Sequence, residues 1–174
     1  MELEYSCLPA QGRFLQLLAT ARRGGRIGES GTGCGVGLAW MASAVDGCTK
    51  IISAEIDPTR ADAAAELFQE IRNVTVLSSS WKALEEHGPF DLLVLDGGGT
   101  GKSAETDPER ADPARFLVRG GTLVIDDFTP STEWPRKVGG NVDEARMAWL
   151  QHPNLLSTEV PIIAKMSVVL AVRL

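Results

Sequence analysis

Four glycines at alternate positions constrain this chain more than any other stretch: Gly31, Gly33, Gly35 and Gly37 follow a short apolar run that ends at Glu29. Apolar side chains then recur at helical spacing in the segment after the last glycine. Glycines at this density permit a tight turn and let a ligand lie against the backbone. The free N–H groups at the start of the helix favour a carboxylate or a phosphate. The stretch therefore predicts a strand, a ligand-binding turn and a helix.

The spacing of these glycines differs from the dinucleotide-binding pattern G-x-G-x-x-G. In the three possible registers, the place of the third glycine holds Val36, Leu38 or Trp40. The pattern E-x-G-x-G-x-G instead resembles the first motif of the class I S-adenosylmethionine (SAM)-dependent methyltransferases. In that family the turn wraps the methionyl part of SAM, and the acidic residue faces its ammonium group. The resemblance implies that Glu29 and the first three glycines bind SAM.

Length and composition predict one domain, residues 1–174, in which residues 1–22 form an N-terminal helical segment. The net charge of −6 disfavours nucleic acid and anionic membranes as partners. Three cysteines without a C-x-x-C pair fit reduced thiols. Neither a signal peptide nor an apolar run of about 18 residues is visible. We therefore expect a cytoplasmic protein that acts on a small molecule.

Short apolar runs alternate with helical patterns along the chain, which predicts a doubly wound α/β fold with a parallel sheet. Beyond the first strand, the expected strands are residues 51–55, 74–77, 90–96, 121–127, 155–161 and 166–173. The last two runs read as a hairpin. The resemblance implies a Rossmann-like, mostly parallel sheet of seven strands with an antiparallel C-terminal strand. The apolar density of the hairpin also suits a homodimer seam, though burial in the sheet explains it equally.

Acidic and aromatic residues at the ends of the second and third strands indicate the rest of the SAM site. Glu55 lies where doubly wound folds place a carboxylate against a ribose diol. Asp57 and Pro58 form a helix start, with Asp57 as the N-cap. In the methyltransferases the end of the third strand contacts adenine, which implies Ser80 and Trp81 here. Trp81 fits an anchor for the next helix equally well.

Three aspartates end the fourth and fifth strands and are expected to lie close together beside SAM: Asp96, Asp126 and Asp127. Clustered carboxylates repel one another unless a cation neutralises them, and hard oxygen ligands suit Mg²⁺ or another divalent cation. The residues therefore predict a metal site, with Asp96 contacting both SAM and the metal. The alternative, in which the aspartates only cap turns and order loops, stays open.

The segments AEIDP, LDGG and IDDF resemble those of the cation-dependent O-methyltransferases, which include the catechol and caffeoyl-CoA enzymes. Asp96 and Asp126 match that family's metal ligands, whereas Asp127 replaces an Asn. Gly99 stands where the catechol enzyme has a catalytic Lys, so Lys102 is the nearest candidate for the proton acceptor. The resemblance implies methyl transfer from SAM to a hydroxyl of a small, aromatic acceptor.

Two rival functions remain. Residues 96–103, DGGGTGKS, come within one residue of the phosphate-binding loop of P-loop NTPases, but Asp96 places a carboxylate where a phosphate would lie. An NTPase would also leave the glycines at 31–37 without a role. The second rival is a protein that binds SAM without transferring its methyl group.

Overall fold

The structure, a computed structural model, describes residues 7–103 and 107–174, so residues 1–6 of the predicted N-terminal segment lie outside the described part. The strands of the main sheet are β1 (Arg26–Ser30), β2 (Lys50–Glu55), β3 (Val74–Ser78), β4 (Phe90–Leu95), β5 (Leu117–Phe128), β8 (Leu155–Ile163) and β9 (Met166–Arg173). The helices are α1 (Pro9–Thr20), α2 (Val36–Ala42), α3 (Pro58–Phe68), the 3-10 helix η1 (Trp81–His87), α4 (Pro113–Phe116) and α5 (Glu144–Leu150). A separate pair of short strands is formed by β6 (Lys137–Val138) and β7 (Asn141–Val142).

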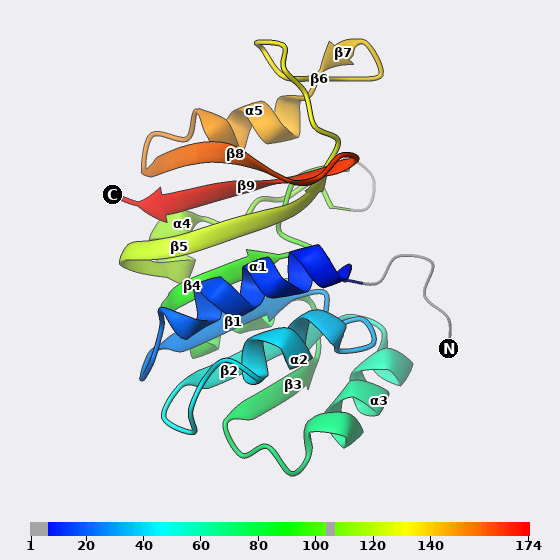
Figure 1. Ribbon diagram of the computed structural model, residues 1–174. Helices are drawn as coiled ribbons and strands as arrows, with labels where there is room; N and C mark the ends of the chain where they lie inside the picture. Colours follow the sequence, from blue (N-terminus) through cyan, green and yellow to red (C-terminus); the bar gives the residue numbers. More distant parts are fainter. Residues whose placement is uncertain (1–6, 104–106) are drawn as a thin grey trace.

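The seven strands are ordered β3-β2-β1-β4-β5-β9-β8 across one sheet (Figure 1). Strands β1 to β5 pair in parallel, and β9 is antiparallel to both of its neighbours, β5 and β8. The predicted doubly wound, mostly parallel sheet with an antiparallel C-terminal strand is therefore confirmed. The strand order reverses between β1 and β4, and ligands of such sheets bind at the carboxyl ends of the strands around this switch point.

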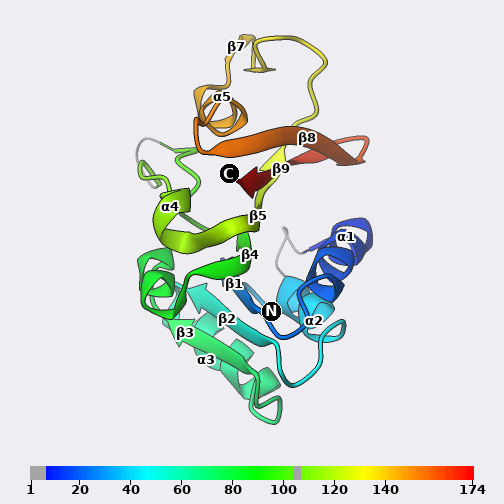
Figure 2. The same ribbon diagram turned by 90° about the vertical axis from the view of Figure 1, so that its left-hand side faces the viewer.

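Each face of the sheet has its own apolar core, because successive strand residues point to opposite faces. Helices α1, α2 and α3 cover one face, where Leu15, Met41 and Phe68 pack on strand residues such as Leu92 and Val124. The other face lies beneath η1, α4 and α5. Figure 2 shows α1 and α2 on one side of the sheet and α4 on the other. This arrangement leaves the carboxyl ends of the strands open for a site.

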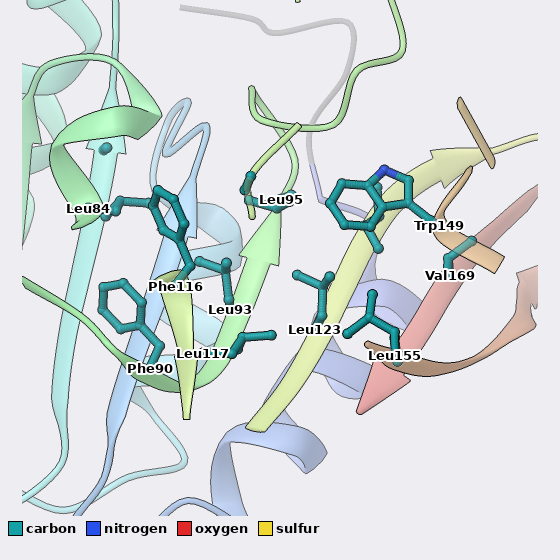
Figure 3. Close-up of a cluster of buried hydrophobic side chains, with 14 of the residues drawn as sticks. Leu84, Phe90, Leu93, Leu95, Phe116, Leu117, Leu123, Trp149, Leu155 and Val169 are labelled. Carbon is teal, nitrogen blue, oxygen red and sulfur yellow. The ribbon is translucent and has the colours of Figure 1, made fainter. Parts of the chain in front are cut away.

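The core beneath η1, α4 and α5 ties distant segments together (Figure 3). Leu84, Phe116 and Trp149 come from the three covering helices and are at most 3% exposed. They meet strand residues such as Leu93 and Leu123. Trp149 therefore fixes α5 against the sheet close to the loop that follows β4.

Helix and strand starts follow the local sequence in most places. Asp57 caps α3 as predicted, since its side chain accepts a hydrogen bond from the Arg60 N–H at 3.0 Å and Pro58 opens the helix. The fifth strand differs from its prediction because it begins at Leu117 rather than at residue 121. Gly120 has a φ of +76°, so the chain passes through the glycine pair there without leaving the strand. Among the described helices, none is long and apolar enough to cross a membrane.

Candidate active site

The glycine turn joins β1 to α2 and sits at the switch point of the sheet. Gly31, Gly33 and Gly35 have positive φ angles of 88°, 56° and 78°. Gly31 also lies against the loop after β4, since a Cβ on it would stand 2.5 Å from the backbone nitrogen of Gly97. Only glycine satisfies both this backbone conformation and this close approach. The predicted strand–turn–helix unit is confirmed, and it holds the ends of β1 and β4 together.

A cavity of about 210 Å³ opens beside this turn, and we call it the turn cavity. It brings together four residues predicted to bind SAM, namely Gly31, Glu55, Ser80 and Trp81. The other four predicted residues, Glu29, Gly33, Gly35 and Asp96, are not among its lining residues. Ile56, Arg60 and Asp107 also line the turn cavity, although the sequence analysis did not single them out for it. Arg60 lies in α3 and Asp107 lies in the loop after β4, so the pattern of strand ends did not indicate them.

Glu55 ends β2 with an anchored carboxylate. It accepts hydrogen bonds from the N–H groups of Gly33 at 2.8 Å and Asp57 at 3.0 Å, and from the Arg60 guanidinium at 2.8 Å. Burial works to raise the pKa of Glu55, but the hydrogen bonds from Asp57, Arg60 and Gly33 together hold it below the ordinary value. Glu55 therefore presents an ionised, oriented carboxylate to the turn cavity, as a ribose-binding residue must.

Glu29 lies beneath the turn in a different electrostatic state. Its side chain is buried, at 3% exposure, and accepts a hydrogen bond from the Ser53 hydroxyl at 2.5 Å. Burial raises the pKa of Glu29 to about 8, and repulsion from Asp96 and Glu55 acts in the same direction. The predicted partner of the SAM ammonium group is therefore protonated at neutral pH in the free protein.

Trp81 packs in the core and also borders the turn cavity, while its predicted contact with adenine stays a prediction. Its ring lies 5.6 Å from that of Phe116, centre to centre, within the core beneath η1 and α4. It also lines the turn cavity, next to Ser80. On the other side of β2's end, the Ile56 side chain is 73% exposed and borders the same cavity. The signal for Ile56 was its position directly after Glu55, at the acidic end of β2.

The glycine-rich loop after β4 is held by protein groups. The Asp107 carboxylate accepts hydrogen bonds from the N–H groups of Gly99, Thr100 and Gly101 at 3.0, 2.9 and 3.1 Å. The Trp149 indole donates to the Thr100 carbonyl at 2.7 Å. In a phosphate-binding loop these N–H groups would point at the phosphate. Because Asp107 takes them, the P-loop alternative for residues 96–103 is wrong.

Asp126 ends β5 with both carboxylate oxygens engaged. Gln11 of α1 donates from its amide to one oxygen, and the Asp127 N–H donates to the other at 2.7 Å. Asp126 is 3% exposed. Its burial raises the pKa of Asp126, against the lowering effect of the Asp127 N–H, Lys102 and Gln11. The contact with Gln11 joins residues 115 positions apart, so no local pattern could have indicated it.

Asp96 follows β4 and keeps part of its side chain open to solvent. Desolvation of its carboxyl group by the surrounding protein raises the pKa of Asp96 to about 7, and repulsion from Asp126 and Asp127 adds to this effect. The nearby Lys102 acts in the opposite direction. The three aspartates therefore lie close enough at one edge of the sheet for Asp126 and Asp127 to repel the charge of Asp96.

Lys102 reaches back to the same edge. Its amine donates hydrogen bonds to the backbone carbonyls of Asp126 and, at 3.1 Å, of Asp127. The nitrogen also lies 4.4 Å from the centre of the Phe128 ring. Burial lowers the pKa of Lys102, although the three aspartates counteract the shift. The amine is thus fixed over the end of β5 by its partners.

The predicted divalent cation requires carboxylate oxygens of Asp96, Asp126 and Asp127 directed at one point. Within residues 7–103 and 107–174, no group of three or more His, Cys, Asp or Glu side chains is placed to hold a metal ion. Both oxygens of Asp126 already accept hydrogen bonds. The side chains as placed do not fit the cation that the resemblance implies, and their role as ligands stays a prediction.

A second cavity, of about 470 Å³, adjoins Lys102. We call it the flap cavity, because Val138 and Val142 of the β6–β7 pair form one wall of it. Lys102 and Arg110 belong to its lining as well. A larger cavity, of about 600 Å³, contains the first residues of β1 and β2 in its lining and so lies at the opposite edge of the sheet. The flap cavity is therefore the candidate for a second ligand beside the turn cavity.

Comparison with known proteins agrees with this geometry. Residues 29–128 match the family model of a methyltransferase domain, from the glycine motif to the end of β5. The catechol O-methyltransferase of Niastella koreensis is 33% identical over an alignment of 133 residues, which covers 70% of this chain. The chain spans 57% of that relative's length.

Solved structures share the fold at lower sequence identity. An O-methyltransferase from Bacillus cereus in complex with SAH, the demethylated form of SAM, has a TM-score of 0.74 at 18% identity, covering 98% of this chain and 84% of that one. The O-methyltransferase TomG from Streptomyces achromogenes, in complex with SAM, has a TM-score of 0.71 at 19% identity and covers 97% and 81% of the two chains. With more than half of its length matched by the family model, the chain belongs to the methyltransferase domain family.

Proposed function

We propose that the protein is a SAM-dependent O-methyltransferase that moves a methyl group to a hydroxyl of a small, aromatic molecule. The observation that carries this proposal is the turn cavity, where the glycine turn and the ionised Glu55 face one space. The curated relative is a catechol O-methyltransferase, which supports a phenolic acceptor.

In this proposal SAM lies along the glycine turn. Glu55 binds the ribose hydroxyls, and Ser80 with Trp81 contacts the adenine. Glu29 and Asp96 lie toward the methionyl end, where Glu29 faces the ammonium group. Gly31 lets the loop after β4 close against the glycine turn, because a Cβ there would lie 2.5 Å from the Gly97 nitrogen. The flap cavity then receives the acceptor, with Lys102 as the proposed catalytic residue.

The reaction is an in-line displacement. An oxygen lone pair of the acceptor forms the bond to the methyl carbon, and the electron pair of the C–S bond returns to sulfur. The sulfonium is a good leaving group, so the protein contributes chiefly alignment and an ionised acceptor. A phenol has a pKa near 10, so only about one molecule in a thousand is ionised at neutral pH. A positively charged group beside the oxygen raises that fraction.

Two further proposals concern the assembly of the protein and its catalytic activity. A homodimer is supported by Leu156 and Leu174, which are 71% and 57% exposed near the β8 edge of the sheet. Light scattering would give the mass of two chains, and Leu156→Asp would reduce it to one. The rival, a protein that binds SAM without transfer, predicts SAM binding without methylation of any acceptor.

Methylation of catechol, followed as SAH release, tests the proposed function. The wild-type protein is expected to form SAH only when SAM and catechol are both present. SAM binding without SAH release, across catechol and related phenols, would favour the non-catalytic rival.

A further inference from the structure

We propose that the Lys102 amine takes the place of the divalent cation in this site, so that methyl transfer proceeds without a bound metal ion. The inference rests on the proposed function, because it concerns the acceptor of that reaction. It starts from a disagreement between the sequence and the structure. The acidic segments resemble those of cation-dependent enzymes, whereas the described side chains do not fit a cation.

The position of the Lys102 nitrogen is the first support. It donates to the carbonyls at the end of β5, from Asp126 and Asp127, and lies over the ring of Phe128. Lys102 also belongs to the wall of the flap cavity. A protonated amine has three N–H donors, and the two carbonyls take two of them. The third can reach an acceptor oxygen in the cavity.

The state of the aspartates is the second support. Gln11 and the Asp127 N–H each donate to one oxygen of Asp126, so the two donors fix the orientation of that carboxylate. A divalent cation at the same edge would also be repelled by the Lys102 ammonium, whose charge already acts on all three aspartates. Asp127 itself adopts a left-handed backbone, with a φ of 59°. We therefore assign the positive charge at the end of β5 to the Lys102 amine.

The chemistry balances without a metal ion. The acceptor hydroxyl releases its proton to water, and the Lys102 ammonium donates a hydrogen bond to the resulting oxygen anion. The oxygen lone pair then forms the bond to the methyl carbon of SAM, while the C–S bond breaks and its electron pair goes to sulfur. Lys102 keeps its own protons throughout, so it acts as a fixed positive charge and replaces the proton acceptor expected from the sequence.

Direct metal binding tests the inference independently of any acceptor. Mn²⁺ is titrated into the SAM-bound wild-type protein, and the signal of free Mn²⁺ is followed by electron paramagnetic resonance. We expect the free signal to equal that of buffer, because no set of carboxylates among residues 7–103 and 107–174 is placed to hold the ion. Loss of the free signal at one ion per chain, reversed in Asp126→Asn, would overturn the inference.

Catalysis gives the second readout, with catechol as the acceptor probe. SAH release is expected to be the same in EDTA and in MgCl₂. Lys102→Met should lower turnover about 100-fold, the scale of removing one donor to a developing oxyanion. Lys102→Arg should keep a large part of the activity, because arginine retains the charge and cannot accept a proton at these pH values. The exposed Lys165, in the β8–β9 turn, provides the control Lys165→Met, which should match wild type.

The outcomes separate the two proposals. Turnover that EDTA abolishes would overturn the role of Lys102 and leave O-methyl transfer standing. Equal loss in Lys102→Met and Lys102→Arg would mean that charge is not what Lys102 supplies. A wild-type protein that binds SAM but methylates no phenol would remove the proposed function, and the Mn²⁺ titration would still decide whether a metal binds.

Discussion

Two carboxylates on neighbouring strands, Glu29 and Glu55, show how partners decide the charge of a site. Glu55 accepts hydrogen bonds from two backbone N–H groups and a guanidinium, so the pKa of Glu55 lies below its ordinary value. Glu29 has the Ser53 hydroxyl as its partner and is buried, so the pKa of Glu29 rises to about 8. One is ready to bind hydroxyl groups, and the other is ready to ionise when a cationic group arrives.

Replacement of Glu55 by Gln should weaken SAM binding by about 1–3 kcal/mol, the scale of a hydrogen bond to a charged group. Isothermal titration with SAM measures the change. Glu66→Gln is the matched control, because Glu66 is an exposed residue of α3. Equal SAM affinity of the two variants would show that Glu55 does not bind SAM.

Glu29 makes the stability of the free protein pH-dependent. Its pKa rises from 4.5 in the unfolded chain to about 8 in the fold, so the folded state holds the extra proton between these values. The contribution of Glu29 to the free energy of unfolding is fully present below pH 4.5 and is lost as the pH rises toward 8. Glu29→Gln does not lose this stability. As the pH rises, its free energy of unfolding should therefore increase relative to that of wild type, by up to about 1.4 kcal/mol per unit of pKa shift.

Urea unfolding on both sides of this window measures the difference between Glu29→Gln and wild type. A constant difference across the window would show that Glu29 is ionised in the folded protein. Ser53→Ala offers a second check, because it removes the hydrogen bond to Glu29 and should raise the pKa further.

The sequence indicated the polar residues at the ends of β1 to β5, because acidic side chains directly after apolar runs stand out. It could not indicate their partners. Gln11 reaches Asp126 across 115 positions, and Lys102 reaches the carbonyls of Asp126 and Asp127 from a different loop. Such contacts depend on how the helices and loops close over the sheet. The metal prediction rested on the carboxylates and on the resemblance, neither of which indicates that Gln11 donates to Asp126 or that Lys102 lies at the same edge.

At the scale of elements, the glycine turn is the unit that fixes the site. Gly31→Ala would place a Cβ 2.5 Å from the backbone of Gly97 in a residue with a φ of +88°. The loop after β4 would have to move, so we expect SAM affinity to fall at least tenfold, together with a loss of stability.

Gly120→Ala is the control for this change. Gly120 has a comparable φ of +76°, but no atom lies within 4 Å of its added Cβ. Both variants carry the backbone cost of a left-handed alanine, about 1 kcal/mol. Gly31→Ala alone should also lose SAM affinity, as measured by isothermal titration, and equal affinities in the two variants would contradict the close approach as the reason for the glycine.

The type of each element followed from the pattern of apolar residues, because the residues of each apolar strand point alternately into the two cores. Element ends were less predictable. The glycine pair at 120–121 read as a strand start, whereas the positive φ of Gly120 lets β5 continue back to Leu117. Local propensity places a break at glycine, but β5 continues across a register shift, in which Leu117 pairs with Phe90 and Thr122 pairs with Leu92 of β4.

For the whole molecule, the order of strands explains why distant motifs form one site. The reversal between β1 and β4 brings the glycine turn beside the loop of Gly97, and β5 adds the aspartates next to it. The flap cavity lies farther along the same edge, at the β6–β7 pair. Both cavities therefore lie at the carboxyl ends of the strands, and Lys102 lines the flap cavity.

Binding of SAM at the turn cavity is tested most directly by isothermal titration of the wild-type protein with SAM and SAH. We expect one molecule of either compound per chain, with affinity reduced in both Glu55→Gln and Gly31→Ala and retained in Gly120→Ala. Absence of binding heat and of any thermal shift with both compounds would contradict the assignment of the site.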